Sequence, residues 1–146
     1  MQYAHSMIRV SNLDETIAFF DKTLGLIEIR RYDSEKGQFT NVFLASEDDV
    51  KAHKDGVVPC IELTYNWGDH TYTGGRNFGH LAFYVDDLYA ACQRILDAGV
   101  EVNRPPRDGH LAFFKTPDGI SIELIQKNGS LPVQEPWVSM PNSGTW

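Results

Sequence analysis

The hydrophobic and polar positions follow the same order in two stretches of the chain. In the first stretch, a strand-like run at residues 5–10 leads to the polar pair Ser11-Asn12, after which apolar residues recur at helical spacing. These apolar positions are Leu13, Ile17, Phe20 and Leu24. Gly25 then interrupts the pattern, as glycine commonly does at a helix end. The pattern predicts a strand followed by a helix.

The second stretch begins at His80 and has the same plan. A strand-like run to Val85 is followed by the polar pair Asp86-Asp87 and by a second set of apolar positions at helical spacing. These positions are Leu88, Ala91, Cys92 and Ile95. Gly99 ends the pattern, so the second stretch also predicts a strand and then a helix.

Three strand-like segments follow each predicted helix. They are residues 26–31, 39–45 and 60–65 in the first half and residues 100–103, 111–115 and 120–126 in the second. The last strand reads CIELTYN in one half and SIELIQK in the other. Each half is therefore strand, helix and three strands, which predicts an α+β chain of two βαβββ modules at about residues 1–66 and 77–127. We expect the two modules to form a single domain, residues 1–127, and residues 128–146 to form an extended C-terminal tail.

Composition narrows the class of partner. The chain has 146 residues and a net charge of -7, which disfavours binding to nucleic acid and to anionic membranes. No apolar run reaches the length of a membrane-spanning helix, and the first ten residues do not have the pattern of a signal peptide. The two cysteines, Cys60 and Cys92, lie in predicted secondary structure, which favours free thiols over a disulfide. We expect a cytoplasmic protein that acts on a small molecule.

Four polar residues occupy matching places in the two halves. His5 and His80 open the first strand of each half, while Glu62 and Glu123 lie in the last strands. Each glutamate stands between an isoleucine and a leucine, so it points away from the face that those neighbours share. Two imidazoles and two carboxylates suit a divalent first-row metal and leave coordination positions for water or substrate. We predict a metal site formed by His5, Glu62, His80 and Glu123.

Several motifs resemble the glyoxalase I (lactoylglutathione lyase) family of the vicinal-oxygen-chelate superfamily. The matching segments are HSMIRV from His5, ELTYNWG from Glu62, NFGH ending at His80, and PDGISIEL at residues 117–124. The ELTYNW run is the most specific of them, since the last motif occurs across the superfamily. The resemblance covers nearly the whole chain. It implies two βαβββ modules whose curled mixed sheets form clefts.

The resemblance also implies a reaction and an assembly. Family members isomerise the hemithioacetal of glutathione and methylglyoxal to S-lactoylglutathione through an enediolate, with the counterparts of Glu123 and Glu62 transferring the proton. In dimeric bacterial members each cleft is completed by two chains. By that resemblance we expect a homodimer in which one chain supplies His5 and Glu62 and the other supplies His80 and Glu123.

Glutathione-binding residues follow from the same resemblance. The family contacts to the tripeptide match Arg9, Asn66 and Arg76. The loop RPPRDGH departs from the family, which has lysine and methionine there, and either Arg104 or Arg107 could replace that lysine. The short chain is similar to the nickel- or cobalt-activated class, with zinc as a further option.

Alternatives remain open at the level of sequence. The same fold serves other metal-dependent enzymes, namely epimerases, thiol transferases and extradiol dioxygenases, and also non-enzymatic proteins that bind small molecules. A fourth ligand, Glu62, disfavours a dioxygenase, which uses two histidines and one carboxylate. The tail is either a loosely held terminus or an arm whose Trp137 and Trp146 dock on this chain or on a second copy.

Overall fold

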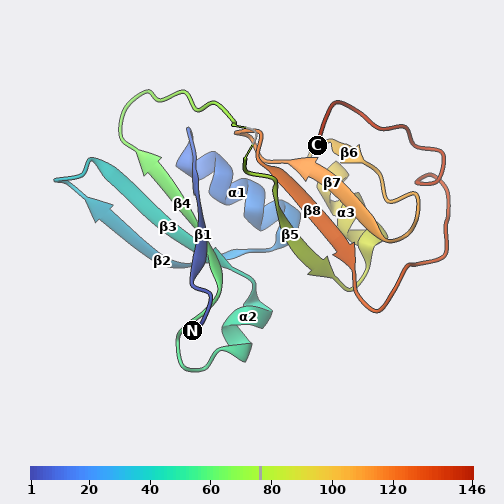
Figure 1. The fold of residues 1–146 in the computed structure, drawn as a ribbon, viewed down its shortest axis with the longest axis horizontal. Helices are drawn as coiled ribbons and strands as arrows, with labels where there is room; N and C mark the ends of the chain where they lie inside the picture. Colours follow the sequence, from blue (N-terminus) through green and yellow to red (C-terminus); the bar gives the residue numbers. More distant parts are fainter. Residues whose placement is uncertain (76) are drawn as a thin grey trace. The chain divides into compact units, whose positions relative to one another are not determined.

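The two halves of the sequence repeat fold as separate units. The computed structural model describes residues 1–75 and 77–146 (Figure 1). The chain consists of two compact units, Met1–Thr73 and Gly74–Trp146. Among the described residues, none of the helices has both the length and the apolar character needed to cross a membrane.

The first unit contains one four-stranded sheet. Its elements are β1 (His5–Arg9), α1 (Leu13–Leu24), β2 (Ile27–Ser34), β3 (Phe39–Ala45), α2 (Glu47–Ala52) and β4 (Cys60–Asn66). The strand order is β1-β4-β3-β2, with β1 parallel to β4 and the other pairs antiparallel. The first and last strands of the module therefore lie side by side, which brings the predicted His5 and Glu62 strands together.

The second unit has the same topology. Its elements are β5 (His80–Val85), α3 (Leu88–Asp97), β6 (Val102–Arg104), β7 (Leu111–Lys115) and β8 (Ser121–Gln126). The strand order is β5-β8-β7-β6, and again the first and last strands are parallel neighbours. Two βαβββ modules with mixed sheets are confirmed.

Local sequence explains where the two main helices begin. The Asn12 side chain accepts a hydrogen bond from the backbone N–H of Glu15 at 3.1 Å, and Asp87 accepts one from Ala90 at 3.0 Å. Both residues cap helix N-termini, as the polar pairs predict. Gly25 ends α1 with φ +66°, in the left-handed region that glycine tolerates.

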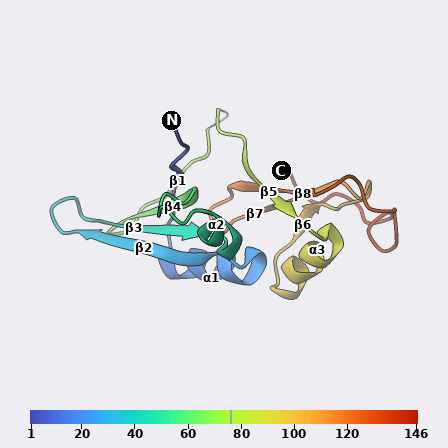
Figure 2. The same cartoon turned by 90° about the horizontal axis from the view of Figure 1, so that it is seen from below.

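Each sheet has one face buried under its helix and one polar face. In the first unit Ile61 and Leu63 are buried with Phe20 of α1, and in the second Ile122 and Leu124 are fully buried with Ile95 of α3. Figure 2 shows α1 and α3 each on one side of its own sheet. Side chains alternate along a strand, so the glutamate between each pair points to the opposite face. This alternation places the candidate site on the face away from the helix.

The structure adds one helix that the sequence pattern did not predict. The short helix α2 has no buried residues and is capped by Ser46, whose hydroxyl accepts from the backbone N–H of Asp49 at 3.1 Å. Its segment, EDDVKA, is polar and lacks an apolar repeat, which is why periodicity missed it. The second strand, β2, also extends to Ser34, beyond the predicted end at residue 31.

The segment 128–146, all of which is described, contains no helix or strand and lies against the second unit. Trp137 is 3% exposed and stacks on Tyr89 of α3, with ring centroids 6.1 Å apart and an interplanar angle of 12°. The Tyr89 hydroxyl also donates to the carbonyl oxygen of Pro132 at 3.0 Å. Trp137 therefore docks on this chain, rather than being part of a loosely held terminus.

Candidate metal centre

The first module brings His5 and Glu62 together. The Nε2 atom of His5 lies 2.8 Å from Oε2 of Glu62. The histidine side chain is 40% exposed and the glutamate side chain 11% exposed. A nitrogen donor that is open to solvent thus stands beside a carboxylate that is nearly enclosed.

The second module repeats this arrangement. The Nε2 atom of His80 lies 3.1 Å from Oε2 of Glu123, and the two side chains are 42% and 14% exposed. The distances and exposures of the two pairs are nearly the same because parallel strands place them in equivalent registers. The repeated His and Glu positions in the sequence therefore form two His–Glu pairs of similar geometry.

Each histidine also contacts a phenylalanine two strands away, on the strand that pairs with the far side of the glutamate strand. The His5 ring meets Phe43 edge-on with centroids 5.9 Å apart, and the His80 ring meets Phe113 at 5.4 Å. Phe43 pairs in register with Glu62, and Phe113 pairs with Glu123. Sequence reasoning missed both phenylalanines, since a phenylalanine in a strand is usually a core residue. The matching sequences NVFLA and LAFFK were the available signal.

Asn41 supports Glu62 in the first module only. Its side-chain amide nitrogen donates a hydrogen bond to Oε1 of Glu62. Its amide oxygen is buried without a hydrogen-bond partner among the described residues. Glu123 has no equivalent amide there, and His80 is its only ion-pair or hydrogen-bond partner in the part of the chain that the structure describes. The two glutamates are therefore held differently.

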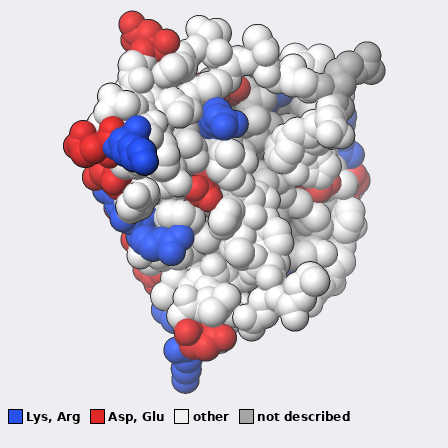
Figure 3. Space-filling model, turned by 60° about the vertical axis from the view of Figure 1, so that its left-hand side comes forward, with Lys and Arg blue, Asp and Glu red and all other residues white. Residues whose placement is uncertain are grey.

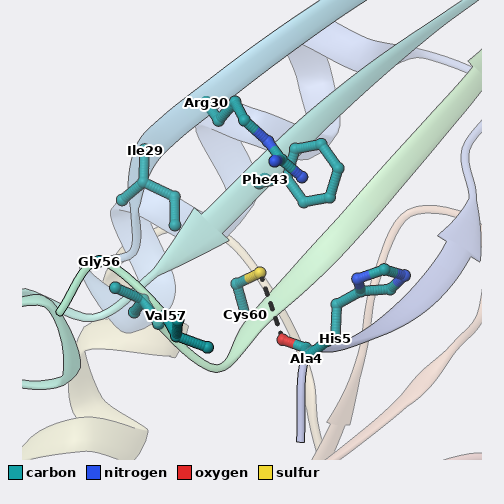
Figure 4. Close-up of a pocket in the computed structure, with 9 residues that line it drawn as sticks. Ala4, His5, Ile29, Arg30, Phe43, Gly56, Val57 and Cys60 are labelled. Atoms are coloured by element: carbon teal, nitrogen blue, oxygen red, sulfur yellow. Dashed lines mark hydrogen bonds between the residues drawn. The ribbon is translucent and has the colours of Figure 1, made fainter. Parts of the chain in front are cut away.

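A cavity of about 290 Å³ opens beside His5 in the first module (Figure 4). The guanidinium carbon of Arg30 lies 3.8 Å from the centroid of the Phe43 ring, a cation–π contact at the cavity wall. Cys60 lines the same cavity and donates weakly to the Ala4 carbonyl, with 3.7 Å between the atoms. Burial raises the pKa of the Cys60 thiol, which makes it a poor nucleophile at neutral pH.

The residues predicted to bind glutathione lie partly on the same polar face. Arg9 pairs with Thr64 in register, two residues before Asn66 on β4, so Arg9 and Asn66 occupy the same end of the first sheet. The Asn66 side-chain oxygen accepts from the Tyr72 hydroxyl at 3.2 Å. Arg76 lies outside the described residues.

Both arginines in the unusual RPPRDGH loop have structural partners. Arg104 donates to the carbonyl oxygen of Leu111 at 2.7 Å and pairs with Asp108 at 2.9 Å. Arg107 donates to the Met140 carbonyl at 2.8 Å and to the Asn142 side chain at 2.6 Å. Their guanidinium groups hold the loop and the tail, so neither is placed as a simple replacement for a substrate-binding lysine.

Asp108 is the anchor of this loop. Burial alone would raise the pKa of its carboxyl, but hydrogen bonds from Arg104 and from the backbone of His110 and Leu111 lower that pKa to about 2. The carboxylate is thus charged under all ordinary conditions. It joins three positions of the loop through its contacts with Arg104, His110 and Leu111.

The donor atoms of each pair fit a divalent metal. Two ligands bound side by side to one ion, each about 2.1 Å from it, lie about 3 Å apart. The observed nitrogen–oxygen separations of 2.8 and 3.1 Å are close to that value. Among the described residues, no group of three or more histidine, cysteine, aspartate or glutamate side chains could hold a metal. Each module by itself therefore offers two ligands.

Surface charge agrees with a small-molecule partner. The face drawn in Figure 3 carries acidic and basic side chains intermixed, rather than a continuous basic stripe. With a net charge of -7, the chain as a whole repels polyanions. Binding of a small anionic ligand therefore depends on individual arginine side chains near the site, since the net charge of the chain does not attract it.

Comparison with known proteins agrees with this geometry. The sequence model of the Glyoxalase/Bleomycin resistance protein/Dioxygenase superfamily matches residues 2–124. This match spans both His–Glu pairs. The chain belongs to this superfamily.

Individual relatives are similar over most of their length. A protein of Vibrio parahaemolyticus named a probable lactoylglutathione lyase is 42% identical over 127 residues, covering 84% of this chain and 88% of the relative. The lactoylglutathione lyase of Haemophilus influenzae is 38% identical over 135 residues, covering 89% and 96%. The solved structure of the trypanothione-dependent glyoxalase I of Leishmania major has a TM-score of 0.78 at 31% identity and covers 87% of each chain.

Proposed function

We propose that this protein is a metal-dependent lactoylglutathione lyase, or glyoxalase I. The observation that carries the proposal is the pair of equivalent His–Glu sites, with Nε2–Oε2 distances of 2.8 and 3.1 Å. The relatives named lactoylglutathione lyase support the same activity. The reaction converts the hemithioacetal of glutathione and methylglyoxal into S-lactoylglutathione.

His5, Glu62, His80 and Glu123 would hold the metal. A mixed set of imidazole and carboxylate ligands suits nickel or cobalt, which we favour, and zinc is a further option. When bound, the divalent cation supplies charge stabilisation to two adjacent substrate oxygens. Because each module offers two of the four ligands, we propose that a homodimer completes each site.

Glu123 is our choice for the group that removes the proton. In the substrate the carbon that carries sulfur loses its proton to a carboxylate, and the neighbouring carbonyl carbon later gains one. Oε2 of Glu123 contacts His80, while Oε1 is not held by an amide in the way that Asn41 holds Glu62. Glu123 therefore has an oxygen available to take the proton, and we propose that Glu62 delivers one to the neighbouring carbon.

Binding of glutathione falls to cationic and amide groups. The tripeptide carries two carboxylates, and arginine matches carboxylate geometry with two parallel hydrogen bonds. Arg9 and Asn66 share one end of the polar face of the first sheet, and we propose that they bind the γ-glutamyl end together with Arg76. The free thiols of Cys60 and Cys92 fit the reducing cytoplasm, which we propose as the compartment.

The test is restoration of turnover in metal-stripped protein. The purified protein is dialysed against a chelator, and nickel, cobalt or zinc is added back before glutathione and methylglyoxal. Formation of the thioester is followed by its rise in ultraviolet absorbance, and His80→Ala protein serves as the matched control. We expect turnover that depends on the added metal and is lost in the variant. A protein that binds metal but forms no thioester with any of the three would contradict the proposal.

A further inference from the structure

We propose that Trp146 forms a wall of the substrate pocket in the second module and determines which aldehydes the enzyme prefers. This inference rests on the proposed function. It concerns the end of the segment 128–146, which contains none of the residues proposed to bind the metal or glutathione.

The final residues are held firmly on the second module. The backbone N–H of Ser143 donates to the carbonyl oxygen of Asn103 at 2.9 Å, and the Asn103 amide donates to the Ser143 carbonyl at 3.2 Å. Lys115 donates to the Thr145 hydroxyl at 3.2 Å. With the two Arg107 bonds described above, four side chains or backbone groups of the module hold residues 140–145 in place.

The loop before β7 also contacts the beginning of the tail, at Leu131. The backbone N–H of Leu131 donates to the Gly109 carbonyl at 2.9 Å. A Cβ atom at Gly109 would lie 2.1 Å from the Leu131 carbonyl oxygen, and Gly109 has φ +65°, so only glycine fits. The RPPRDGH loop therefore serves to bind the tail.

Trp146 lies near His80, on the face of the second sheet that is opposite α3. Its ring lies against Phe113 with centroids 6.5 Å apart, and Phe113 in turn contacts the ring of His80. Figure 2 shows the C-terminus on the side of the second sheet opposite α3. Strand alternation puts His80 and Glu123 on that same side, because Ile122 and Leu124 are buried on the helix side. The chain of ring contacts runs directly from the indole to the candidate metal ligand.

The indole contacts Phe113 but is not buried. Trp146 remains 44% exposed, although many hydrogen bonds fix the residues before it. A tryptophan that is almost half exposed leaves apolar surface for a ligand. The matching place in the first module is different, because there the guanidinium of Arg30 covers Phe43. The second module thus offers an aromatic surface beside the reacting centre.

The chemistry of the substrate fits this surface at its aldehyde-derived part. The methyl or phenyl substituent is on the carbonyl carbon, next to the carbon that carries sulfur. A metal held by the predicted ligands would stabilise the oxygens of these two carbons, which would bring the substituent close to His80 and Glu123. We infer that the indole contacts this substituent, which is a methyl group in methylglyoxal and a phenyl ring in phenylglyoxal. A phenyl substituent gains a ring–ring contact that a methyl group cannot make.

The experiment compares stable thioethers on Trp146→Ala and wild-type protein. Dissociation constants of S-benzylglutathione and S-methylglutathione are measured by calorimetry on the nickel-loaded protein, and kcat/KM is measured with phenylglyoxal and methylglyoxal. We expect Trp146→Ala to weaken S-benzylglutathione about fivefold to tenfold and S-methylglutathione less than about twofold. The kcat/KM for phenylglyoxal should fall by a similar ratio relative to methylglyoxal.

Two variants separate a ligand contact from a structural role. Trp146→Phe keeps an aromatic ring and should retain most of the preference for the benzyl compound, and Val133→Ala, an exposed apolar change in the same tail, should leave both affinities unchanged. Equal weakening of both thioethers in Trp146→Ala, or no change in either, would overturn the inference while wild-type turnover still supports the proposed function. A wild-type protein without turnover that binds neither thioether would overturn both.

Discussion

His80 places the edge of its imidazole ring against Phe113, with the centroids 5.4 Å apart and the planes inclined at 81°. The first module has the same contact between His5 and Phe43, at 5.9 Å and 72°. Each phenylalanine lies opposite the glutamate in sheet register, so its ring and the carboxylate both contact the same imidazole. We propose that the rings orient the predicted metal ligands before any metal binds.

Phe113→Leu tests this orienting role. Leucine keeps the residue apolar but removes the edge-on ring contact, which is worth about 0.5–1.5 kcal/mol. We expect nickel affinity to fall about threefold to tenfold, measured by competition with a chelating dye. Tyr84→Leu removes an exposed ring from the same strand face as His80 and should leave the affinity unchanged. Wild-type affinity in Phe113→Leu would mean that the ring does not orient His80.

Glu123→Gln tests the assignment of the proton acceptor. Glutamine keeps an oxygen ligand of nearly the same shape but cannot take a proton, so the metal should stay largely bound while kcat falls about 10²–10⁴-fold. The measurement pairs metal content of the purified variant with thioester formation. Glu35→Gln, an exposed change in the hairpin between β2 and β3, should behave as wild type. Full activity in Glu123→Gln would show that another group accepts the proton.

The topology and both His–Glu pairs could be predicted from the sequence because the same pattern occurs in both halves, so each half supports the interpretation of the other. A single histidine or glutamate in a strand carries little information, but His5 and His80 open equivalent strands. Phe43 and Phe113 were missed because their role depends on which face of the strand they occupy, and a phenylalanine is usual on either. Asn41 was missed because its partner, Glu62, lies on another strand, and no local pattern records that pairing.

The loop and the tail could not be predicted for a related reason. The contact between Arg107 and Met140 joins residues that are distant in sequence and lack any periodic pattern. The choice between Arg104 and Arg107 as a substrate-binding residue therefore had no basis in the sequence, and the structure uses both arginines for local bonds. Helix α2 was missed because it buries no residue, so nothing in its sequence marks an apolar face.

Trp137→Ala tests whether the tail is part of the fold. The indole is 3% exposed and stacks on Tyr89, so its removal leaves a cavity between the tail and α3. Large-to-small changes at buried aromatic residues cost about 3–5 kcal/mol, and we expect a loss in that range in the free energy of unfolding by urea. Val133→Ala, which is 61% exposed, should cost less than about 0.5 kcal/mol. A Trp137→Ala protein as stable as wild type would mean that the tail contributes nothing to stability.

Asp108 predicts a dependence of stability on pH. Its carboxyl has a pKa of about 2 in the folded protein, against an ordinary value of 3.8, so the folded state binds fewer protons than the unfolded state in acid. The stabilisation is complete above about pH 4 and is lost as the pH falls through 2. Because the side chain is 46% exposed, solvent screening reduces the contribution to about 1 kcal/mol.

Asp108→Asn removes this titration while preserving the acceptor for the backbone N–H groups of His110 and Leu111. We expect the variant to be less stable than wild type at pH 7 and the difference to shrink as the pH is lowered from 4 toward 2, measured by urea unfolding at each pH. In an Arg104→Met background the same substitution should have a smaller effect, because the charge that stabilises the carboxylate is gone. A difference between wild type and Asp108→Asn that stays constant from pH 7 to pH 2 would show that the Asp108 carboxyl does not titrate with the depressed pKa.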